Sequence, residues 1–594
     1  MFAAAGAQYE NLHSRTAYWR CPGLLRVGRT RTTHTSRVLL RIPRMSNSTP
    51  SRRGQTALAA LAGIIAAGVV LGVAELAGAF FRASATPVIA MGSTFIDFTP
   101  LWLKEFAIDT FGTNDKLALF VGMGVTITLL AAVLGIVAYR KWALGVAGVL
   151  LMGAIILACV LTRAGAGAAD ALPTVLGTAA GLLALRWLIA RLHHAAVGST
   201  AGSTGGGATD GTQRTGVAEP VGTRDDAAPA ATAVRNPRST SRRGFFAAAG
   251  LTAVVAAAAA GGGRLLATAR NNGTAARANP QFPAPASPAP PLPAGVQSPV
   301  EGVTPFITPN GDFYRIDTAL SVPQLNADTW ELRVHGMVEE EFTLSFQDLL
   351  DADLIERYVT LTCVSNPVGG DLVGNAKWLG YPLRDVLARA RPLEGADMVL
   401  STSSDGFSAS TPLPVLQDDR DAILAVAMND EPLPVEHGYP VRMVVPGLYG
   451  YVSATKWVVD LEVTRFEDAT AYWTDRGWSE KGPIKTMTRV EVPRSFASVP
   501  AGSVMIGGVA WAQHRGISEV EVSVDGGDWQ PATLAAEASV DTWRQWSFEA
   551  RLDSGSHTVR ARATDPEDGV QTEERADTVP DGASGWQTVQ FTVD

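Results

Sequence analysis

The feature that most constrains this chain is a set of four apolar runs, each close to the length of a membrane-crossing helix. The runs cover about residues 57–81, 117–139, 142–161 and 171–190. A helix needs roughly 20 mainly apolar residues to cross the hydrocarbon core of a bilayer. Only 18% of the 594 side chains are charged, and the mean hydropathy is positive at +0.11. The pattern therefore predicts a four-helix transmembrane domain over residues 57–194.

The charges beside these runs predict the orientation of the domain. Basic side chains stand before the first run, between the second and third, and after the fourth, at Arg52, Arg53, Arg140, Lys141 and Arg191. The connection between the first two runs is acidic instead, with Asp97, Glu105 and Asp109. The positive-inside rule then places both ends of the domain in the cytoplasm. Residues 1–56 are predicted to be a basic cytoplasmic extension, in which Met45 is an alternative start.

A low-complexity segment and a segment that resembles an export signal follow. Residues 195–240 are rich in Gly, Thr, Ala and Ser, which predicts a flexible cytoplasmic linker. In residues 241–265, Arg242 and Arg243 directly precede Gly-Phe-Phe and an Ala-rich apolar run. This arrangement resembles a twin-arginine export signal, and the alternative is an ordinary fifth membrane helix. Export would put everything after this segment outside the membrane; whether the chain is cleaved around residues 267–269 stays open.

The remaining half is predicted to contain a spacer and two globular domains. Residues 266–300 are Pro/Ala-rich and should form a stiff extracytoplasmic spacer. Residues 301–488 mix alternating strands with short helices, one of which Ser345 is expected to open at about 345–350. This pattern predicts an α+β domain without a nucleotide-binding glycine motif. Residues 489–594 are short strands separated by turns, with a hairpin signal at 525–529, and predict an immunoglobulin-like β-sandwich.

Composition excludes several classes of site. The chain has three cysteines, Cys21, Cys159 and Cys363, and no C-x-x-C pair, which argues against a disulfide framework, a zinc knuckle and an iron–sulfur cluster. None of the histidines lies in the four apolar runs, so no haem is expected there. The net charge of −8 makes nucleic acid a poor candidate partner.

Cys363 ends the strand-like run Tyr-Val-Thr-Leu-Thr-Cys and is followed by Gly, Asn and Pro. Three interpretations are open for this thiol. It is a buried structural residue, a nucleophile that needs a nearby base, or a thiolate metal ligand that needs further ligands. Spacing by itself favours the structural interpretation, because no second cysteine or histidine cluster accompanies it.

A series of motifs across most of residues 301–594 changes that balance. They are Phe-Tyr-Arg-Ile-Asp at 313–317, Thr-Leu-Thr-Cys at 360–363, Gly-Asn-Ala-Lys-Trp-Leu-Gly at 374–380, Leu-Arg-Asp-Val-Leu at 383–387, His-Gly-Tyr-Pro-Val-Arg at 437–442, Lys-Trp at 456–457, Gly-Gly-Val-Ala-Trp at 507–511 and Val-Glu-Val-Ser-Val-Asp-Gly-Gly at 520–527. In this order they resemble the sulfite oxidase family of molybdopterin enzymes. The resemblance implies a molybdenum–molybdopterin cofactor whose two dithiolene sulfurs leave room for one protein thiolate, Cys363.

The resemblance also implies a set of residues around the cofactor. By the family pattern these are Phe313, Tyr314, Arg315, Asp317, Asp405, His437, Arg442, Ala454, Thr455 and Lys456. A guanidinium fork suits phosphate oxygens, and a lysine acts as a point charge. For His437 and Arg442 the alternative is that the first is a turn residue and the second a solvated strand residue. His335 is assigned to structure, and His514 and Arg515 could line a substrate mouth or face solvent.

Departures from the family pattern bear on the substrate. Sulfite-oxidising members carry an arginine-rich segment after the cysteine, where this chain has Val-Ser-Asn-Pro-Val-Gly-Gly, and a tyrosine where it has Val509. An anion needs cationic donors, so sulfite oxidation is disfavoured unless Lys377, Arg357 or Arg515 replaces the missing charge.

The predicted protein is thus a membrane-anchored, exported oxidoreductase for two-electron oxygen-atom transfer on a small S- or N-oxide or sulfur compound. Its electrons would pass to or from an external electron-transfer protein or a quinone-linked partner, and a homodimer through the sandwich is plausible by family resemblance alone. The alternatives are a sulfite oxidase proper and an exported binding or scaffold protein that lost the metal.

Overall fold

The structure is a computed structural model that describes residues 52–81, 85–100, 103, 106, 110–111, 115–163, 166–197, 242–270 and 282–594. The expectations for residues 1–51, for nearly all of the linker and for residues 271–281 lie outside the described residues. The side chains of Arg242 and Arg243, on which the twin-arginine interpretation depends, also lie outside them.

The N-terminal region is helical, as the apolar runs predict. Its helices are α1 (Arg52–Gly78), α2 (Pro87–Phe98), α4 (Asp115–Arg140), α5 (Trp142–Leu161), the 3-10 turn η3 (Ala168–Ala171), α6 (Leu172–Val197) and α7 (Arg242–Arg270). Among the described helices of this region, α1, α4, α5, α6 and α7 are long and apolar enough to cross a membrane, whereas α2 and η3 are too short. The predicted helices are therefore confirmed, and the crossing itself stays a prediction.

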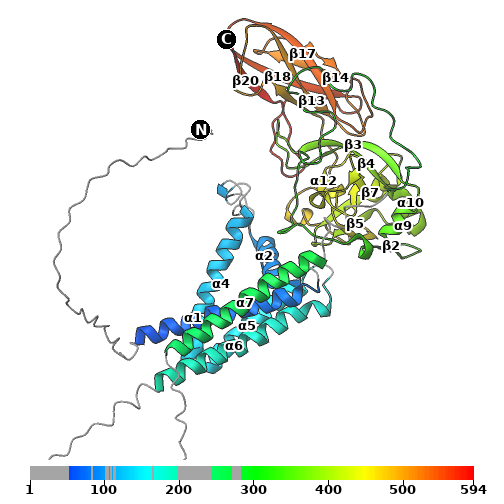
Figure 1. Cartoon of the computed structure of the whole chain (residues 1–594). Helices are drawn as coiled ribbons and strands as arrows, with labels where there is room; N and C mark the ends of the chain where they lie inside the picture. The colour runs from blue at the N-terminus through cyan, green and yellow to red at the C-terminus, as the bar shows by residue number, and fades with distance from the viewer. Residues whose placement is uncertain are drawn as a thin grey trace, which may run out of the picture. The chain divides into compact units, whose positions relative to one another are not determined.

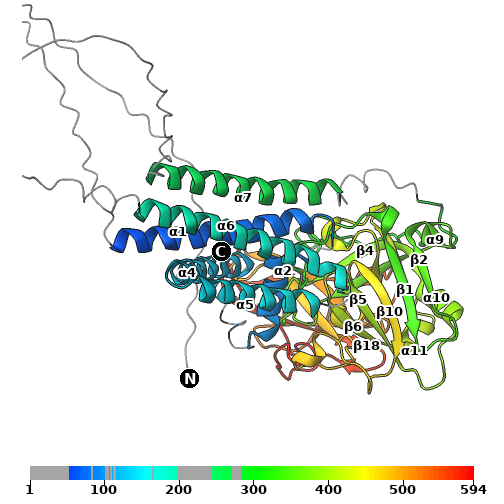
Figure 2. The ribbon, with the colours of Figure 1, turned by 90° about the horizontal axis from the view of Figure 1, so that it is seen from below.

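Helix α1 is the centre of this region, since it packs against α4, α6 and α7. Figure 2 shows α1, α6 and α7 running side by side. Gly63 of α1 faces Gly135 of α4, and a Cβ on either residue would clash with the backbone of the other helix. Small residues that let helix backbones approach this closely are typical of packing within membranes.

The α+β region contains two sheets around one core (Figure 1). The first has the order β2-β1-β10-β5-β6, with β1 (Glu331–Gly336), β2 (Phe342–Ser345), β5 (Met398–Ser403), β6 (Ser408–Pro412) and β10 (Val458–Thr464). The second has the order β3-β4-β7-β8 with β9 on β7, and consists of β3 (Ile355–Thr362), β4 (Val373–Pro382), β7 (Ile423–Met428), β8 (Glu431–Pro432) and β9 (Arg442–Val444). Short helices connect the strands: η4 (Ala327–Thr329), α9 (Phe346–Leu350), α10 (Leu383–Ala390), α11 (Leu413–Gln417), η5 (Val435–His437), α12 (Gly450–Ser453) and η6 (Thr474–Arg476).

The predicted helix that Ser345 opens is present as α9. Ser345 Oγ accepts a hydrogen bond from the Asp348 amide, and the Asp348 carboxylate accepts one from the Ser345 amide. This reciprocal capping box satisfies two amides that the first turn would otherwise leave unpaired.

The C-terminal region contains two further sheets. One has the order β11-β13-β17-β16, with β11 (Met487–Val492), β13 (Gly502–Trp511), β16 (Thr533–Leu534) and β17 (Arg544–Leu552). The other has the order β12-β20-β18-β14-β15 with β19 on β18, and consists of β12 (Ser498–Val499), β14 (Glu519–Val524), β15 (Gln530–Pro531), β18 (Gly555–Asp565), β19 (Gly569–Val570) and β20 (Thr588–Val593). Side chains of both sheets share one core. The hairpin predicted at 525–529 connects β14 to β15.

Strand β3, which leads to Cys363, is an edge strand that other segments cover. Ser287 forms a parallel bridge to Ile355, so part of the predicted spacer lies on this edge instead of standing free. From the C-terminal region, the Asp541 carbonyl accepts from the Thr360 amide, and Gln513 Nε2 donates to Thr362 Oγ1. An uncovered edge exposes unpaired backbone groups, which explains why the Pro-rich segment packs there.

Candidate active site

Cys363 lies immediately after β3, at the start of a tight loop that returns to β4. Its amide donates to the carbonyl of Leu372, and its own carbonyl accepts from the amide of Asn366. The thiol is buried, with 9% of the residue exposed, and Sγ lies 2.9 Å from Ser365 Oγ. Burial raises the pKa of the Cys363 thiol, although the Ser365 hydrogen bond opposes this. Such a thiol becomes a thiolate only when a nearby cation, such as a metal, stabilises it.

Two phenols lie near this thiol. Tyr314 stacks on Phe313 with ring centroids 5.3 Å apart, and burial followed by the nearby Cys363 raises the pKa of its hydroxyl. Tyr449 is almost fully buried, and burial raises its pKa to about 12. Its oxygen accepts from the Lys485 amide at 3.3 Å. Both phenols therefore stay neutral across the physiological pH range.

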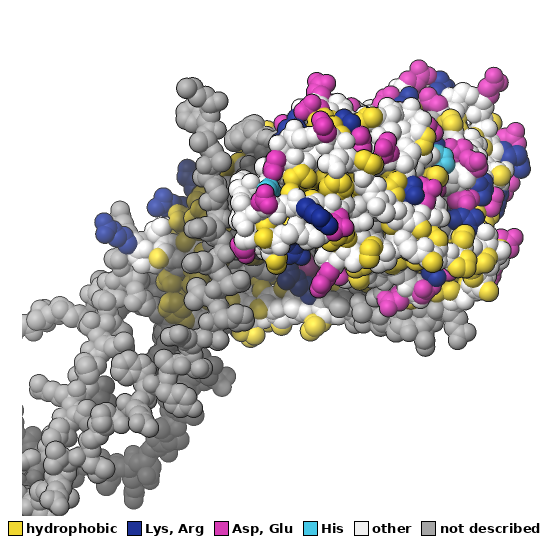
Figure 3. Space-filling view, turned by 90° about the horizontal axis from the view of Figure 1, so that it is seen from above, with side chains coloured by type: hydrophobic (Ala, Val, Ile, Leu, Met, Phe, Trp, Pro, Cys, Tyr) yellow, Lys and Arg dark blue, Asp and Glu magenta, His cyan; other side chains and the backbone are white. Residues whose placement is uncertain are grey.

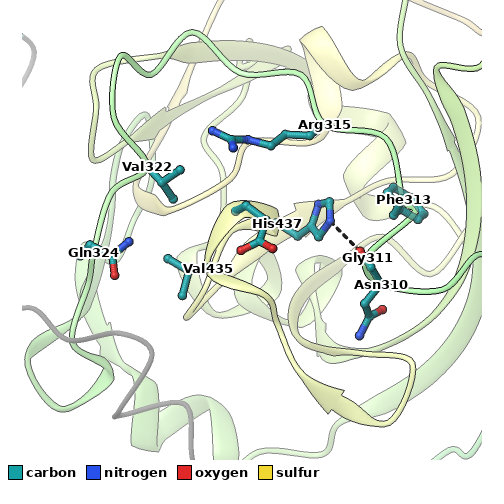
Figure 4. Close-up of a pocket in the computed structure, with 9 residues that line it drawn as sticks. Asn310, Gly311, Phe313, Arg315, Val322, Gln324, Val435 and His437 are labelled. Carbon is teal, nitrogen blue, oxygen red and sulfur yellow. Dashed lines mark hydrogen bonds between the residues drawn. The ribbon is translucent and has the colours of Figure 1, made fainter. Parts of the chain in front are cut away.

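A pocket of about 460 Å³ opens beside Phe313 (Figure 4). It is lined by Asn310, Gly311, Phe313, Arg315, Val322, Gln324, Val435, Glu436 and His437. His437 Nε2 lies 3.1 Å from the Asn310 carbonyl oxygen, which can only accept, so this nitrogen carries the proton. Burial and the neighbouring Arg442 lower the pKa of His437 to about 4. The wall of the pocket therefore contains the neutral imidazole of His437, whose Nδ1 is unprotonated.

Arg442 is a buried cation beneath this wall. Its Nη1 donates to the His437 carbonyl at 3.2 Å, and its guanidinium lies 5.1 Å from the ring centroid of Trp378. Within the described residues no carboxylate pairs with it, and burial lowers its pKa to about 10. A buried charge without a counterion is costly, which makes the position suited to an anionic ligand.

Lys456 adds a second cation on the same side. Its Nζ lies 3.1 Å from Asp317 Oδ2, and the same carboxylate oxygen accepts from Arg315 Nε at 2.8 Å. Burial lowers the pKa of Lys456 to about 8 despite this partner. Burial would raise the pKa of Asp317, but the cations around it, Lys456 foremost, lower it. The carboxylate therefore holds Arg315 and Lys456 beside the pocket, and its Oδ1 also lies 3.4 Å from Lys116 Nζ.

The structure brings together most of the residues that the sequence suggested, but not all of them. Phe313, Arg315 and His437 line the pocket, and Tyr314, Asp317, Arg442 and Lys456 lie around it. Thr455 is buried against Ser401, 2.7 Å from its hydroxyl, and its carbonyl accepts from the Met443 amide. Thr455 therefore positions β9. Its neighbour Ala454 packs on the core.

Asp405 lies elsewhere. Its carboxylate accepts from Thr318 Oγ1 at 3.4 Å and from the Phe407 amide at 3.3 Å, and it lines a different cavity. The two uncertain residues of the C-terminal region are paired: His514 Nδ1 lies 3.2 Å from Asp541, and the nearly buried Arg515 lies 3.3 Å from Asp565. His335 pairs with Asp460 across β1 and β10, in agreement with a structural role.

Sequence reasoning missed Asn310, Gly311, Gln324, Glu436 and Tyr449. An Asn-Gly pair just before the Phe-Tyr-Arg segment marks a turn, and Pro-Gly-Leu-Tyr-Gly places an aromatic residue between glycines. Both signals were available, but neither says that the turn faces a pocket.

The donor set fits the implied cofactor. The buried Cys363 thiol needs a cation, and Tyr314 interacts electrostatically with both this thiol and the Arg442 guanidinium. Arg442 and Lys456 in turn both act on the neutral imidazole of His437. Soft thiolate suits molybdenum, and the cations suit the phosphate of a pterin. The fold and this site define an oxidoreductase domain that binds molybdopterin.

Comparison with known proteins supports that class. The family model described as "Oxidoreductase molybdopterin binding domain" matches residues 319–473. Human mitochondrial sulfite oxidase is 30% identical over 313 residues, which cover 44% of this chain and 56% of that protein. The "Uncharacterized oxidoreductase YuiH" of Bacillus subtilis is 33% identical over 156 residues, 26% of this chain and 74% of that one. The chain thus spans only about half the length of the mammalian relatives it matches.

A solved structure is also similar. The sulfane dehydrogenase SoxCD from Paracoccus pantotrophus aligns with 23% identity and a TM-score of 0.44, covering 50% of this chain and 85% of that one. The chain belongs to the sulfite oxidase family of molybdopterin-dependent oxidoreductases.

Proposed function

We propose that this protein is a membrane-anchored, exported oxidoreductase that removes an oxygen atom from small, neutral S- or N-oxides. The choice of substrate depends on one observation. Three cations could replace the arginines that sulfite-oxidising members use, and each of them is already ion-paired with a carboxylate. Lys377 contacts Asp430 and Glu356, Arg357 contacts Asp421, and Arg515 contacts Asp565. An ion-paired cation has little attraction left for a second anion.

The loop after Cys363 supports the same choice. It contains no basic side chain from Val364 to Leu372, and Arg489, which donates to the Gly370 carbonyl beneath it, is already paired with Glu491. Val509 is fully buried, so no polar group reaches the site from that position. A neutral oxide needs no cationic pocket, whereas sulfite does.

The roles of the chain's own residues follow from their positions. Cys363 would ligate the molybdenum, and Arg442 and Lys456 would hold the anionic end of the pterin, while the neutral His437 would accept a hydrogen bond from the pterin at Nδ1. When bound, the cofactor supplies a molybdenum centre that changes oxidation state by two electrons during oxygen-atom transfer. Tyr314 and Tyr449 would exclude water and offer neutral hydroxyls to the substrate.

The anchor and the C-terminal region complete the proposal. Five helices of spanning length support a multi-pass membrane protein, and the positive-inside pattern supports catalysis on the extracytoplasmic side. The two C-terminal sheets with a shared core support an immunoglobulin-like sandwich of the dimerisation type. Figure 3 shows acidic and basic side chains interspersed on one face, and the net charge is −8, so nucleic acid is not a proposed partner.

Two assays on the full-length protein test the function. One supplies reduced methyl viologen with a series of sulfoxides and N-oxides, and the other supplies sulfite with ferricyanide. We expect viologen oxidation that depends on the oxide, and no sulfite-dependent reduction of ferricyanide. Sulfite turnover that exceeds oxide turnover would overturn the choice of substrate, and a purified protein without molybdenum would favour a binding protein.

A further inference from the structure

A second cavity, of about 1140 Å³, lies between the helical region and the α+β region. Half of the lining residues on the helical side are apolar, among them Phe81, Ile89, Ile96 and Phe120, and the other half are polar or charged, among them Glu75, Asp170 and Arg264. The opposite side is formed by residues 318–326, residues 404–407, Tyr472 and Arg476. The cavity therefore has an apolar patch formed by Phe81, Ile89, Ile96 and Phe120, with charged side chains beside it.

Ion pairs connect the two walls. Asp97 of α2 contacts Arg476 at 3.2 Å and accepts from the Tyr472 hydroxyl at 3.4 Å. The same carboxylate lies 2.8 Å from Arg163, which follows α5. Lys116, at the start of α4, donates to the carbonyl of Ala319 at 2.7 Å. Three of these four contacts join the helical region to the α+β region, and the Arg163 contact joins α2 to the end of α5 within the helical region.

The side of the membrane predicted from charge agrees with these contacts. The positive-inside pattern puts the connection 82–115, the α5–α6 connection and the end of α7 on the extracytoplasmic side. Asp97, in the first of these connections, and Lys116, directly after it, contact the α+β region, and Arg163 of the α5–α6 connection pairs with Asp97. Because the charge pattern was derived without the contacts, the two observations support each other.

The two cavities also adjoin. Val322 and Gln324 line both this cavity and the pocket beside Phe313 and His437. Asp405, Phe407 and Tyr472 lie on the wall nearest the α+β region, and the rings of Phe407 and Tyr472 have centroids 5.9 Å apart. A ligand in the second cavity would therefore be next to the site that binds the pterin.

We propose that this cavity binds a membrane quinol, which serves as the electron donor. The inference rests on the proposed function, since oxide reduction needs two electrons and two protons from outside. A quinol gives up both and becomes a quinone, while the oxide takes them up and releases its oxygen as water. An isoprenoid tail matches the apolar patch, the ring stacks with Phe407 or Tyr472, and Asp97 accepts a hydrogen bond from a quinol hydroxyl.

The volume is sufficient for this ligand. Pockets for small molecules and cofactors enclose about 300–1,000 Å³. The cavity is slightly larger than that range. It accommodates the ring and the first part of the tail, and the rest of the tail would follow the helices.

The test uses the full-length protein in lipid nanodiscs and menaquinol-4 as the probe. A photoreactive azido-quinone, followed by peptide mass spectrometry, maps the binding position. The blocking variant is Ser93→Trp, which puts an indole on the cavity-lining face of α2. The matched control is Phe95→Trp, two residues away on the same helix, where the side chain is 54% exposed and outside the lining.

We expect labelling of α2 and of residues 404–407, and at least tenfold weaker quinol binding in Ser93→Trp but not in Phe95→Trp. Quinol-driven oxide reduction should fall by the same factor in Ser93→Trp, while viologen-driven reduction stays unchanged. Viologen-driven turnover without quinol binding would overturn this inference and leave the proposed function standing. Quinol binding without any oxide turnover would overturn the proposed function but not the site. Labelling displaced by phospholipid and not by menaquinol would assign the cavity to a lipid and overturn the inference.

Discussion

Arg442 offers the sharpest test of the site, because its replacement should change two measurements in opposite directions. Burial lowers the pKa of this guanidinium to about 10, and no carboxylate of the described residues pairs with it. A shift of this size corresponds to a cost on the order of 3 kcal/mol for keeping the charge buried in the cofactor-free protein. Arg442→Met removes that cost.

The replacement also removes hydrogen bonds to the carbonyls of His437 and Met443, each worth about 1 kcal/mol. The cofactor-free variant should therefore be about 1 kcal/mol more stable than the wild type. A charged hydrogen bond to phosphate contributes about 1.5–3 kcal/mol, so the loaded variant should hold the cofactor roughly 10- to 100-fold more weakly.

Urea unfolding of protein made in cells without cofactor synthesis measures the first effect. The molybdenum-to-protein ratio during dialysis of loaded protein measures the second. Arg357→Met is the matched control, because Arg357 is ion-paired with Asp421 and lies outside the pocket lining. It should destabilise the protein by about 1 kcal/mol and leave molybdenum retention unchanged. If Arg442→Met destabilises the empty protein by more than about 2 kcal/mol and retains molybdenum normally, Arg442 is a structural cation and the reasoning is wrong.

Three further predictions concern the same site. Cys363→Ser should abolish oxide reduction and the thiolate-to-molybdenum absorption band while the circular dichroism spectrum is retained; normal turnover would exclude this residue as the metal ligand. The cofactor-free protein should lose on the order of 3 kcal/mol of unfolding free energy through His437 as the pH falls from 6.5 to 4. The reason is that only the unfolded state binds a proton on this imidazole in that pH window. The pH dependence of unfolding should therefore flatten in His437→Gln. In Gly374→Ala the new Cβ would lie 2.8 Å from the Phe313 ring, so we expect the free energy of unfolding to fall by about 1–3 kcal/mol and molybdenum to be released faster. Adding Phe313→Leu should partly reverse both effects. An unchanged unfolding midpoint would contradict this packing.

Local patterns in the sequence predicted the apolar helices and the strand that leads to Cys363. The apolar runs predicted α1, α4, α5 and α6, because burial in hydrocarbon requires continuous apolar length. The capping residue Ser345 and the alternating run before Cys363 predicted α9 and β3 in the same way. The order of the motifs also indicated the family, which the comparisons confirm.

Charge pairing lay beyond these local patterns. Lys377, Arg357 and Arg515 were all candidates for an anion site until the structure paired each with a carboxylate. The partner of Arg515 is 50 residues away, and that of Arg357 is 64 residues away. Contacts over such separations depend on how sheets pack, which no local periodicity encodes.

The sequence by itself determined the kinds of elements, their order and the thiol that ends β3, because short-range periodicity and motif spacing set these. The tertiary structure decided which charges are free: no carboxylate among the described residues pairs with Arg442, while the alternatives are neutralised. It also separated Asp405 from the pocket that contains Phe313 and placed it in the second cavity. The physical reason is that burial and ion pairing are properties of three-dimensional neighbours, and these neighbours come from distant parts of the chain.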